Sequence, residues 1–284
     1  MRHVSFADGS SAPALGLGTW RLGERRASAA AEADTLLEAF RIGYRLVDTA
    51  EMYADGGAES VVGQAIAQAL AEGLVTREQL FIVSKVLPDN ASRRGVPAAC
   101  KASLKRLGLN QLDLYLLHWR SSVPLAETVG ALEQLRADGL IRRWGVSNFD
   151  TGDIDELVQL PAGTDCAANQ VYYSASQRGI EFDLLPAQRA RRMPLMAYCP
   201  IDQGALAANA TLAAIGRRHG ASAAQIALAW VLRQADVIAI PKAGRAEHLR
   251  QNWAAATLAL SAADLAEIDR AMSAPRMKLP LAMT

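Results

Sequence analysis

The chain has 284 residues, about half of them apolar and few of them aromatic, and its formal net charge is +1. A charge this close to zero gives no reason to expect nucleic acid or an acidic membrane surface as a partner. No apolar run approaches the roughly 18 residues of a membrane span, and the first residues lack the long apolar stretch of a secretory signal. The three cysteines fall in no metal-ligand or disulfide spacing and fit a reducing compartment, so we expect a cytoplasmic protein.

The chain begins with a signal for a short β-hairpin. Val4–Phe6 and Ala14–Leu15 are short apolar stretches on either side of Ala7–Ser10. That connection contains Asp-Gly, a strong turn signal between two strands. We expect this hairpin to close the bottom of the fold and to have a structural role.

Eight short, continuously apolar runs follow, as expected for parallel strands that are buried on both faces. In chain order they are Leu15–Trp20, Arg45–Thr49, Leu80–Lys85, Leu112–His118, Ile141–Val146, Cys166–Val171, Pro194–Tyr198 and Val237–Pro241. Amphipathic stretches such as Pro124–Gly139 separate them. Ser222-Ala-Ala-Gln225 and Ser261-Ala-Ala-Asp264 have the pattern of capping boxes, each opening a helix.

Strand and helix patterns alternate about eight times without a linker, which favours one domain over residues 1–284. We predict an α/β fold, a (β/α)8 TIM barrel with the N-terminal hairpin closing the bottom and extra helices near the C-terminus. An open, doubly wound sheet is the alternative. Its Gly-x-Gly-x-x-Gly fingerprint is incomplete here, because no helix start directly follows the first two glycines in Leu15–Gly23.

Polar side chains recur at the carboxyl ends of the predicted strands. In a (β/α)8 barrel all strands end on the face that holds the active site. Each residue has a structural explanation by itself, such as a cap or a solvated charge, but their recurrence at one topological position favours a shared site. They are Asp48, Lys85, His118, Ser147, Asn148, Gln170, Tyr198 and Lys242.

Four residues indicate acid–base chemistry at that site. Lys85 and Asp48 both enter the barrel mouth, where burying either charge alone is costly, so we expect them to pair. Tyr53 follows Asp48 in the next loop and is placed beside the ammonium, which predicts a lowered phenol pKa and a general acid for an oxyanion. His118 adds a donor that can orient a carbonyl oxygen.

The sequence shows no group that would attack the carbonyl carbon. It has no Gly-x-Ser-x-Gly elbow and no Cys next to a His. The histidines His3, His118, His219 and His248 fall in no metal-ligand spacing, so we expect no metal. A hydride from a bound cofactor would supply the missing nucleophile.

Eight motifs are spread in order over nearly the whole chain: Leu15-Gly-Leu-Gly-Thr-Trp20, Asp48-Thr-Ala-Glu-Met-Tyr53, Ser84-Lys85, Leu116-Leu-His-Trp119, Gly145-Val-Ser-Asn-Phe149, Asn169-Gln170, Ala197-Tyr-Cys-Pro200 and Ile240-Pro-Lys242. Together they resemble the motifs of the aldo/keto reductases. The chain looks most similar to the short bacterial members that reduce methylglyoxal and similar small aldehydes. The resemblance implies an NADP(H)-dependent oxidoreductase that acts on the CH–OH group of donors and reduces small aldehydes and ketones, aromatic aldehydes included, to alcohols.

The resemblance also implies roles for individual residues. The implied catalytic tetrad is Asp48, Tyr53, Lys85 and His118, with Tyr53 donating the proton. Ser147, Asn148 and Gln170 would hold the nicotinamide carboxamide, Tyr198 would stack on the ring, and Lys242 would bind the adenosine 2′-phosphate. The implied cofactor-binding set is Gly18, Thr19, Trp20, Asp48, Ser147, Asn148, Gln170, Tyr198, Pro200, Ile201, Ile240, Lys242, Ala243, Arg245, His248, Gln251 and Asn252, and the substrate pocket is Trp20, Tyr53, His118 and Trp119.

Some residues depart from the family pattern. Cys199 and Ile201 stand where the family has Ser and Leu. Ala243 and His248 stand where a Ser and an Arg commonly bind the 2′-phosphate, and Arg245 is the candidate replacement. NADP(H) is still the expected cofactor.

Only a short segment, Ser273–Thr284, follows the last predicted helix, which predicts a shallow, open site for a small carbonyl substrate.

A non-catalytic nicotinamide-cofactor sensor or regulatory barrel is one alternative, although the complete tetrad favours an enzyme. A phosphate-sugar isomerase or hydrolase is another, but paired carboxylates and a Gly-rich phosphate loop are missing. We expect no nucleic acid or membrane partner, and a monomer, with a weak dimer as the alternative.

Overall fold

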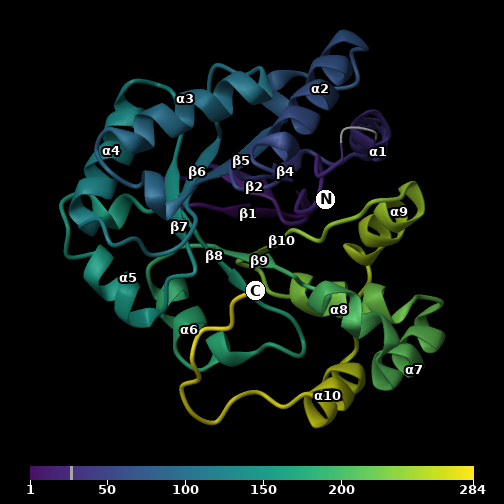
Figure 1. Ribbon diagram of the computed structural model, residues 1–284. Coiled ribbons are helices and arrows are strands. Elements are labelled where there is room, and N and C mark those ends of the chain that lie inside the picture. The colour runs from purple at the N-terminus through teal and green to yellow at the C-terminus, as the bar shows by residue number, and fades with distance from the viewer. Residues whose placement is uncertain (26–27) are drawn as a thin grey trace.

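The computed structural model describes residues 1–25 and 28–284, in which an eight-stranded parallel sheet is surrounded by helices (Figure 1). The strands pair in chain order. Two parallel bridges, Leu15 with Ala239 and Gly18 with Lys242, join the first strand to the last, so the sheet closes into the predicted (β/α)8 barrel. The strands are β3 (Leu17–Gly18), β4 (Leu46–Asp48), β5 (Phe81–Val86), β6 (Leu114–Leu117), β7 (Trp144–Ser147), β8 (Asn169–Tyr172), β9 (Leu195–Tyr198) and β10 (Val237–Ala239).

Each barrel strand is followed by at least one α-helix, and β9 and β10 are each followed by two, which gives the extra helices predicted near the C-terminus. No helix in the described ranges is long and apolar enough to cross a membrane. Short 3-10 helices lie in the loops, among them η3 (Pro88–Asn90) and η6 (Asp202–Ala208). The α-helices are α1 (Ala29–Ile42), α2 (Gly57–Ala71), α3 (Gly95–Leu107), α4 (Leu125–Ala137), α5 (Thr151–Leu157), α6 (Leu184–Ala190), α7 (Ala210–His219), α8 (Ala223–Leu232), α9 (Ala246–Ala255) and α10 (Ala262–Ala271).

The barrel strands are buried on both faces. Every residue of β4 to β8 is buried, because side chains fill the barrel and helices cover its outside. The two predicted capping boxes are confirmed. Ser222 Oγ accepts a hydrogen bond from the Gln225 N–H (3.3 Å), and Ser261 Oγ accepts one from the Asp264 N–H (3.1 Å).

The N-terminal hairpin is present, but its second strand was predicted wrongly. β1 (His3–Ser5) pairs with β2 (Ser11–Pro13), not with Ala14–Leu15. The turn closes early, because the Phe6 N–H donates to the Ser10 carbonyl (2.8 Å). Ala14 and Leu15 instead run along β10 and help to close the barrel.

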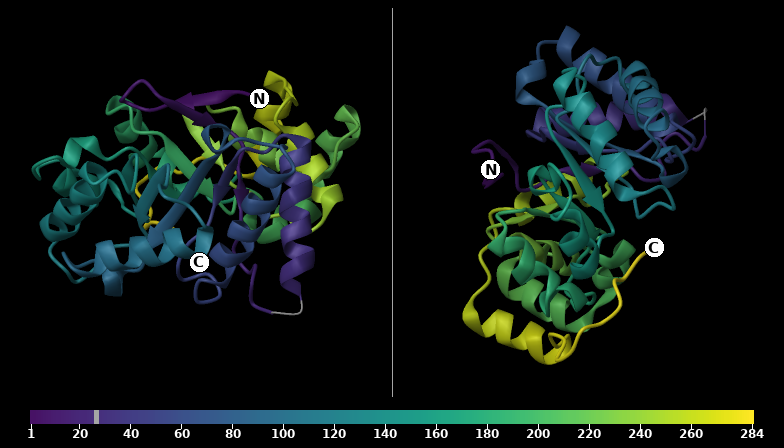
Figure 2. Two further views of the ribbon diagram at one scale, coloured as in Figure 1. Left: turned by 90° about the horizontal axis from the view of Figure 1, so that it is seen from above. Right: turned by 90° about the vertical axis from the view of Figure 1, so that its left-hand side faces the viewer.

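The hairpin covers the amino end of the barrel. Phe6 stacks on Phe81, the first residue of β5, with ring centroids 5.7 Å apart. Arg143, just before β7, pairs with Asp8 of the hairpin turn at 2.7 Å. Figure 2 shows the hairpin at one end of the barrel and the C-terminal residue at the other. The prediction that it closes the bottom of the fold is confirmed.

The segment after α10 runs back to the mouth of the barrel (Figure 1, yellow). Lys278 Nζ lies 3.3 Å from Asp183 Oδ2 and 3.7 Å from Asp150 Oδ2, and these contacts hold the segment against the loops after β7 and β8. Met283 and Thr284 then line the cavity described below. The segment therefore reaches the cavity, which the sequence did not predict.

Candidate active site

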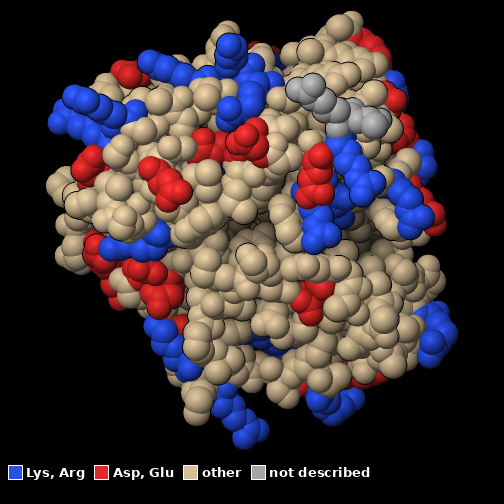
Figure 3. Space-filling model, in the orientation of Figure 1, with Lys and Arg blue, Asp and Glu red and all other residues tan. Residues whose placement is uncertain are grey.

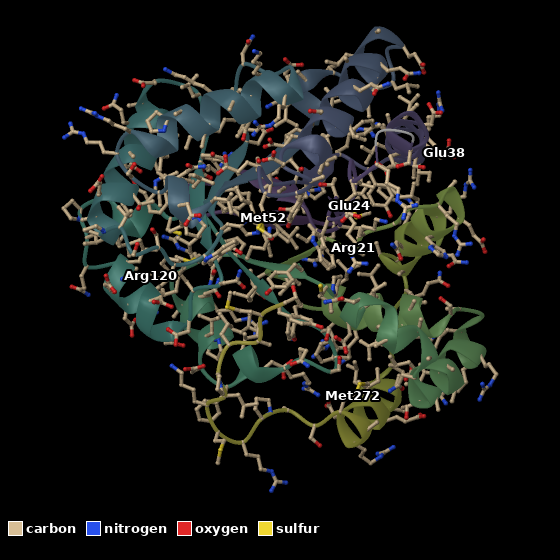
Figure 4. All side chains as sticks on the ribbon, viewed as in Figure 1. Arg21, Glu24, Glu38, Met52, Arg120 and Met272 are labelled. Carbon is tan, nitrogen blue, oxygen red and sulfur yellow. The ribbon has the colours of Figure 1, made fainter. Side chains whose placement is uncertain are left out.

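A cavity of about 650 Å³ lies at the carboxyl end of the barrel. Every barrel strand except β5 contributes lining residues, either from the strand itself or from the loop that follows it. The middle of this face is mostly uncharged, with Lys, Arg, Asp and Glu gathered mainly toward its rim (Figure 3). Figure 4 places Met52 and Arg21, both of which line the cavity, near the centre of the same view.

The structure brings together most of the residues expected at the site. Lys85 lies beneath the cavity and reaches it through Asp48 and Tyr53. Ala243 is buried outside the cavity lining and Arg245 is exposed beside it, so neither is brought into the cavity wall. The predicted residues that line it are Gly18, Thr19, Trp20, Asp48, Tyr53, His118, Trp119, Ser147, Asn148, Gln170, Tyr198, Pro200, Ile201, Ile240, Lys242, His248, Gln251 and Asn252.

Other lining residues were not predicted. Most are next to a predicted residue in the sequence, and that adjacency is the one signal for them. Ser222 had been recognised only as a helix cap, and the segment after α10 carries no local signal for its return to the barrel. The residues are Arg21, Met52, Cys199, Gln203, Gly204, Ala207, Ser222, Ala224, Pro241, Met283 and Thr284.

The Lys85 ammonium is fully buried and uses all three of its hydrogens. It donates to Asp48 Oδ2 (2.7 Å), the Thr49 carbonyl (2.9 Å) and the Tyr53 hydroxyl (3.2 Å). Asp48 Oδ1 accepts a further bond from Gln170 Nε2 (2.7 Å). Burial by itself would lower the pKa of Lys85, but Asp48 and Tyr53 outweigh it and raise the pKa. The predicted pairing of Lys85 with Asp48 is present.

Tyr53 is oriented as a proton donor. Its oxygen accepts a hydrogen bond from Lys85, so the single phenol hydrogen is left for another acceptor, and Tyr53 itself lines the cavity. Burial raises the pKa of Tyr53, and the opposing effect of Lys85 is too small to reverse this. The predicted lowering of the phenol pKa toward neutral pH is therefore wrong, because the loss of water around this half-buried phenol outweighs the effect of the ammonium. Tyr53 is a protonated phenol at neutral pH.

The loop that carries Tyr53 is held by Glu51. Glu51 Oε1 accepts hydrogen bonds from the Leu87 N–H (2.6 Å) and from Asn90 Nδ2 (3.0 Å), which ties the loop to the segment after β5. The backbone φ of Ala54 is +53° and that of Asp55 is +52°, a left-handed conformation that is unfavourable outside glycine. External contacts of this kind keep the loop, and with it Tyr53, next to Lys85.

His118 is a neutral imidazole beside the phenol. Burial, with a smaller effect from the Lys85 charge, lowers the pKa of His118 to about 2. Its ring meets the Tyr53 ring edge-on, with centroids 5.7 Å apart. Across residues 1–25 and 28–284, no group hydrogen-bonds its buried Nδ1.

Amide and hydroxyl groups gather on the β7–β8 side of the cavity. Asn148 Nδ2 donates to the His118 carbonyl (3.1 Å), and the Tyr198 hydroxyl donates to Asn148 Oδ1 (2.9 Å). Ser147 Oγ donates to the Gln170 carbonyl (2.8 Å). These groups are fixed by the protein and offer both donors and acceptors, a donor set that fits a carboxamide such as that of nicotinamide.

Cationic groups and helix N-termini lie on the β10 side. Lys242 and His248 line the cavity together with Ser222, the N-cap of α8. Arg245 is the N-cap of α9, and its Nη2 lies 2.9 Å from His248 Nε2. A guanidinium can only donate, so this imidazole nitrogen is unprotonated in this arrangement. Helix N-termini and a lysine together form a site suited to phosphate groups.

Known proteins are similar to this chain over nearly its whole length. Residues 14–273 match the aldo/keto reductase family. The chain is 48% identical to methylglyoxal reductase YeaE of Escherichia coli over 99% of both chains, and 32% identical to an NADH-specific methylglyoxal reductase of the same organism over 88% of this chain and 91% of that protein. A crystal structure of an aldo-keto reductase from Klebsiella pneumoniae in complex with NADPH superposes with a TM-score of 0.94 at 45% identity, covering 100% of this chain and 99% of the other.

Proposed function

The chain belongs to the aldo/keto reductase family, and on that premise we propose that it reduces small aldehydes and ketones to alcohols with NADP(H) as the cofactor. The observation that carries the proposal is the arrangement of Lys85 and Tyr53. Because the ammonium donates to the phenol oxygen at 3.2 Å, the phenol proton is left for a ligand in the cavity. That is the geometry of a general acid for a carbonyl oxygen.

The cofactor, when bound, supplies a hydride to the carbonyl carbon. Tyr53 gives its proton to the oxygen that becomes negative as the carbonyl is reduced. The Lys85 ammonium stabilises the phenolate that remains, and Asp48 keeps the ammonium charged and in place. Neutral His118 can donate one N–H to the same oxygen.

The residues present fit a nicotinamide dinucleotide. Ser147, Asn148 and Gln170 would hold the carboxamide and Tyr198 would lie against the ring. Lys242 would hold the 2′-phosphate that distinguishes NADP(H) from NAD(H). A solved relative is described with NADPH, whereas one E. coli relative is named NADH-specific.

Arg245 would assist Lys242 at the 2′-phosphate. Its present contact is His248 Nε2, at 2.9 Å. Together the two cations support a preference for NADPH over NADH.

The substrate side of the cavity suits a small, partly apolar carbonyl compound. Trp20 and Met52 present exposed apolar surface there. Trp119 packs on His118 with ring centroids 4.9 Å apart, and Met283 of the C-terminal segment also lines the cavity. We propose α-oxoaldehydes such as methylglyoxal, and aromatic aldehydes, as good substrates, and steroids as poor ones. The relative named methylglyoxal reductase supports this class. We further propose that residues 1–284 act as one catalytic domain, as a cytoplasmic monomer.

A panel of carbonyl compounds, assayed by loss of NADPH absorbance, tests the proposal. We expect methylglyoxal and benzaldehyde-type aldehydes to be reduced with a higher kcat/KM than any steroid ketone. Tyr53→Phe is the matched control, because it removes one oxygen from the cavity wall and should bind NADPH while turning over very slowly. NADPH binding without turnover of any carbonyl would instead indicate a sensor.

A further inference from the structure

The segment that follows β9 is strained and forms one wall of the cavity. Cys199, Asp202 and Gln203 have backbone φ angles of 48°, 52° and 51°, and Gly204 continues at 98°. Residues with a Cβ rarely adopt this left-handed conformation, and it persists only where surrounding contacts hold it. Contacts outside the segment must therefore maintain its shape.

We call residues 199–208 the cofactor loop, because most of them face the proposed cofactor site. Asp202 lies in the middle of this loop but does not line the cavity, so its carboxylate is directed elsewhere. This direction suits an anionic ligand, since a carboxylate facing the cavity would repel phosphate groups. The loop residues that line the cavity are Cys199, Pro200, Ile201, Gln203, Gly204 and Ala207.

Asp202 is bound by two hydroxyl groups from the neighbouring strand and its loop. The Tyr172 hydroxyl donates to Asp202 Oδ1, and Ser176 Oγ donates to Asp202 Oδ2 at 2.8 Å. Tyr172 is the last residue of β8 and is buried, so it is a rigid anchor. Its ring also lies against that of Tyr198, with centroids 5.4 Å apart. We call Asp202, Tyr172 and Ser176 the Asp202 latch.

We propose that Asp202 is a positioning residue for the cofactor, because its carboxylate, held by Tyr172 and Ser176, sets the strained cofactor loop in its binding shape before the dinucleotide arrives. The proposal rests on NADP(H) being the ligand of this cavity. A wall that is ordered in advance loses less conformational freedom when the ligand binds, so the affinity is higher. Hydrogen bonds to a charged group are stronger than those between neutral groups, which makes a carboxylate effective in this position.

Two measurements on the full chain test the latch. The first is the Kd of NADPH from its fluorescence on binding, and the second is hydrogen exchange of residues 199–208 without cofactor. For Asp202→Ala we expect the Kd to rise by about tenfold or more, with faster exchange of the loop. Asp202→Asn keeps one acceptor oxygen, so its Kd and its loop exchange should lie between those of Asp202→Ala and those of the wild type. Asp155→Ala, which removes an exposed carboxylate paired with Arg191, is the matched control and should behave as the wild type.

A double-mutant cycle separates the latch from a general effect of Asp202. In a Tyr172→Phe/Ser176→Ala background the latch is already lost, so adding Asp202→Ala should change the Kd by less than about twofold. The proposal is overturned if Asp202→Ala binds NADPH as the wild type does. It is also overturned if Asp202→Ala raises the Kd by the same factor in the wild-type and the Tyr172→Phe/Ser176→Ala backgrounds. Should Asp202→Ala fail to fold, Tyr172→Phe and Ser176→Ala alone decide it, because each must raise the Kd. A wild-type chain that does not bind NADPH would overturn the proposed function instead.

Discussion

Replacing Lys85 by Met is expected to damage both stability and reduction. The side chain is fully buried, and Asp48 is 2% exposed. Without the ammonium, the Asp48 carboxylate keeps only the Gln170 donor at 2.7 Å and becomes a buried charge without a counter-ion. Losing one partner of a buried ion pair costs about 3–5 kcal/mol. At roughly 2–4 °C per kcal/mol for a domain of this size, the Tm should fall by roughly 6 °C or more.

The same variant should lose at least about a hundredfold in the kcat of reduction, because the phenolate left by Tyr53 is no longer stabilised. Thermal unfolding followed by circular dichroism, and NADPH oxidation with methylglyoxal across a pH series, measure the two effects. Adding Asp48→Asn to Lys85→Met removes the unpaired charge and should recover much of the Tm but not the activity. Asp48→Asn alone should be milder than Lys85→Met, because the ammonium remains.

Lys101→Met, on an exposed face of α3, is the control for the loss of a lysine. It should leave both the Tm and the turnover within experimental scatter of the wild type. The reasoning is refuted if Lys85→Met unfolds within a degree or two of the wild type, or if it reduces methylglyoxal with the wild-type pH profile.

Four further outcomes are expected. Tyr53→Phe should keep nearly normal NADPH affinity and lose about 10²–10⁴ in turnover, and near-normal reductase activity would remove Tyr53 from the mechanism. Burial raises the pKa of Tyr53, so the phenol stays protonated, and His118, with a pKa of about 2, stays neutral. Neither group changes its charge from about pH 6 to 9, so the kcat of reduction should be flat over that range. A loss of reduction with a midpoint below about pH 9 would contradict this. Lys242→Ala should weaken the binding of NADPH far more than that of NADH, and Arg245→Ala should have the same effect to a smaller degree. Titration of both cofactors at two pH values measures this, and equal losses of affinity would place the phosphate elsewhere. Ala54→Gly should relieve the left-handed strain at φ +53° and raise the stability by about 1 kcal/mol in thermal unfolding, and an unchanged Tm would show that Ala54 is not strained.

Much of the barrel could be predicted from the chain because its strands are buried on both faces. Continuous apolar runs such as Phe81–Val86 are visible in a sequence, and so are the polar residues that end them. Once the barrel is assumed, the carboxyl ends of all strands meet, so Asp48, Lys85 and His118 could be placed together without knowledge of any distance.

Features that depend on local turn geometry were less predictable. The Asp-Gly signal located the hairpin, but the hydrogen bond from Phe6 to the Ser10 carbonyl closed the turn sooner than the apolar pattern suggested. β2 therefore occupies Ser11–Pro13. An apolar pattern shows which residues are buried, not which backbone groups pair.

What the sequence determined by itself is the order of strands and helices and the chemical groups at the barrel mouth, because both follow from residue type and spacing. Only the tertiary structure decided the protonation of Tyr53, since burial raises its pKa more than Lys85 lowers it. It alone also brought Met283 into the cavity and joined Asp202 to Tyr172 across two strands. Burial and long-range contacts arise from the packing of segments distant in the chain, and no local pattern of residues encodes them.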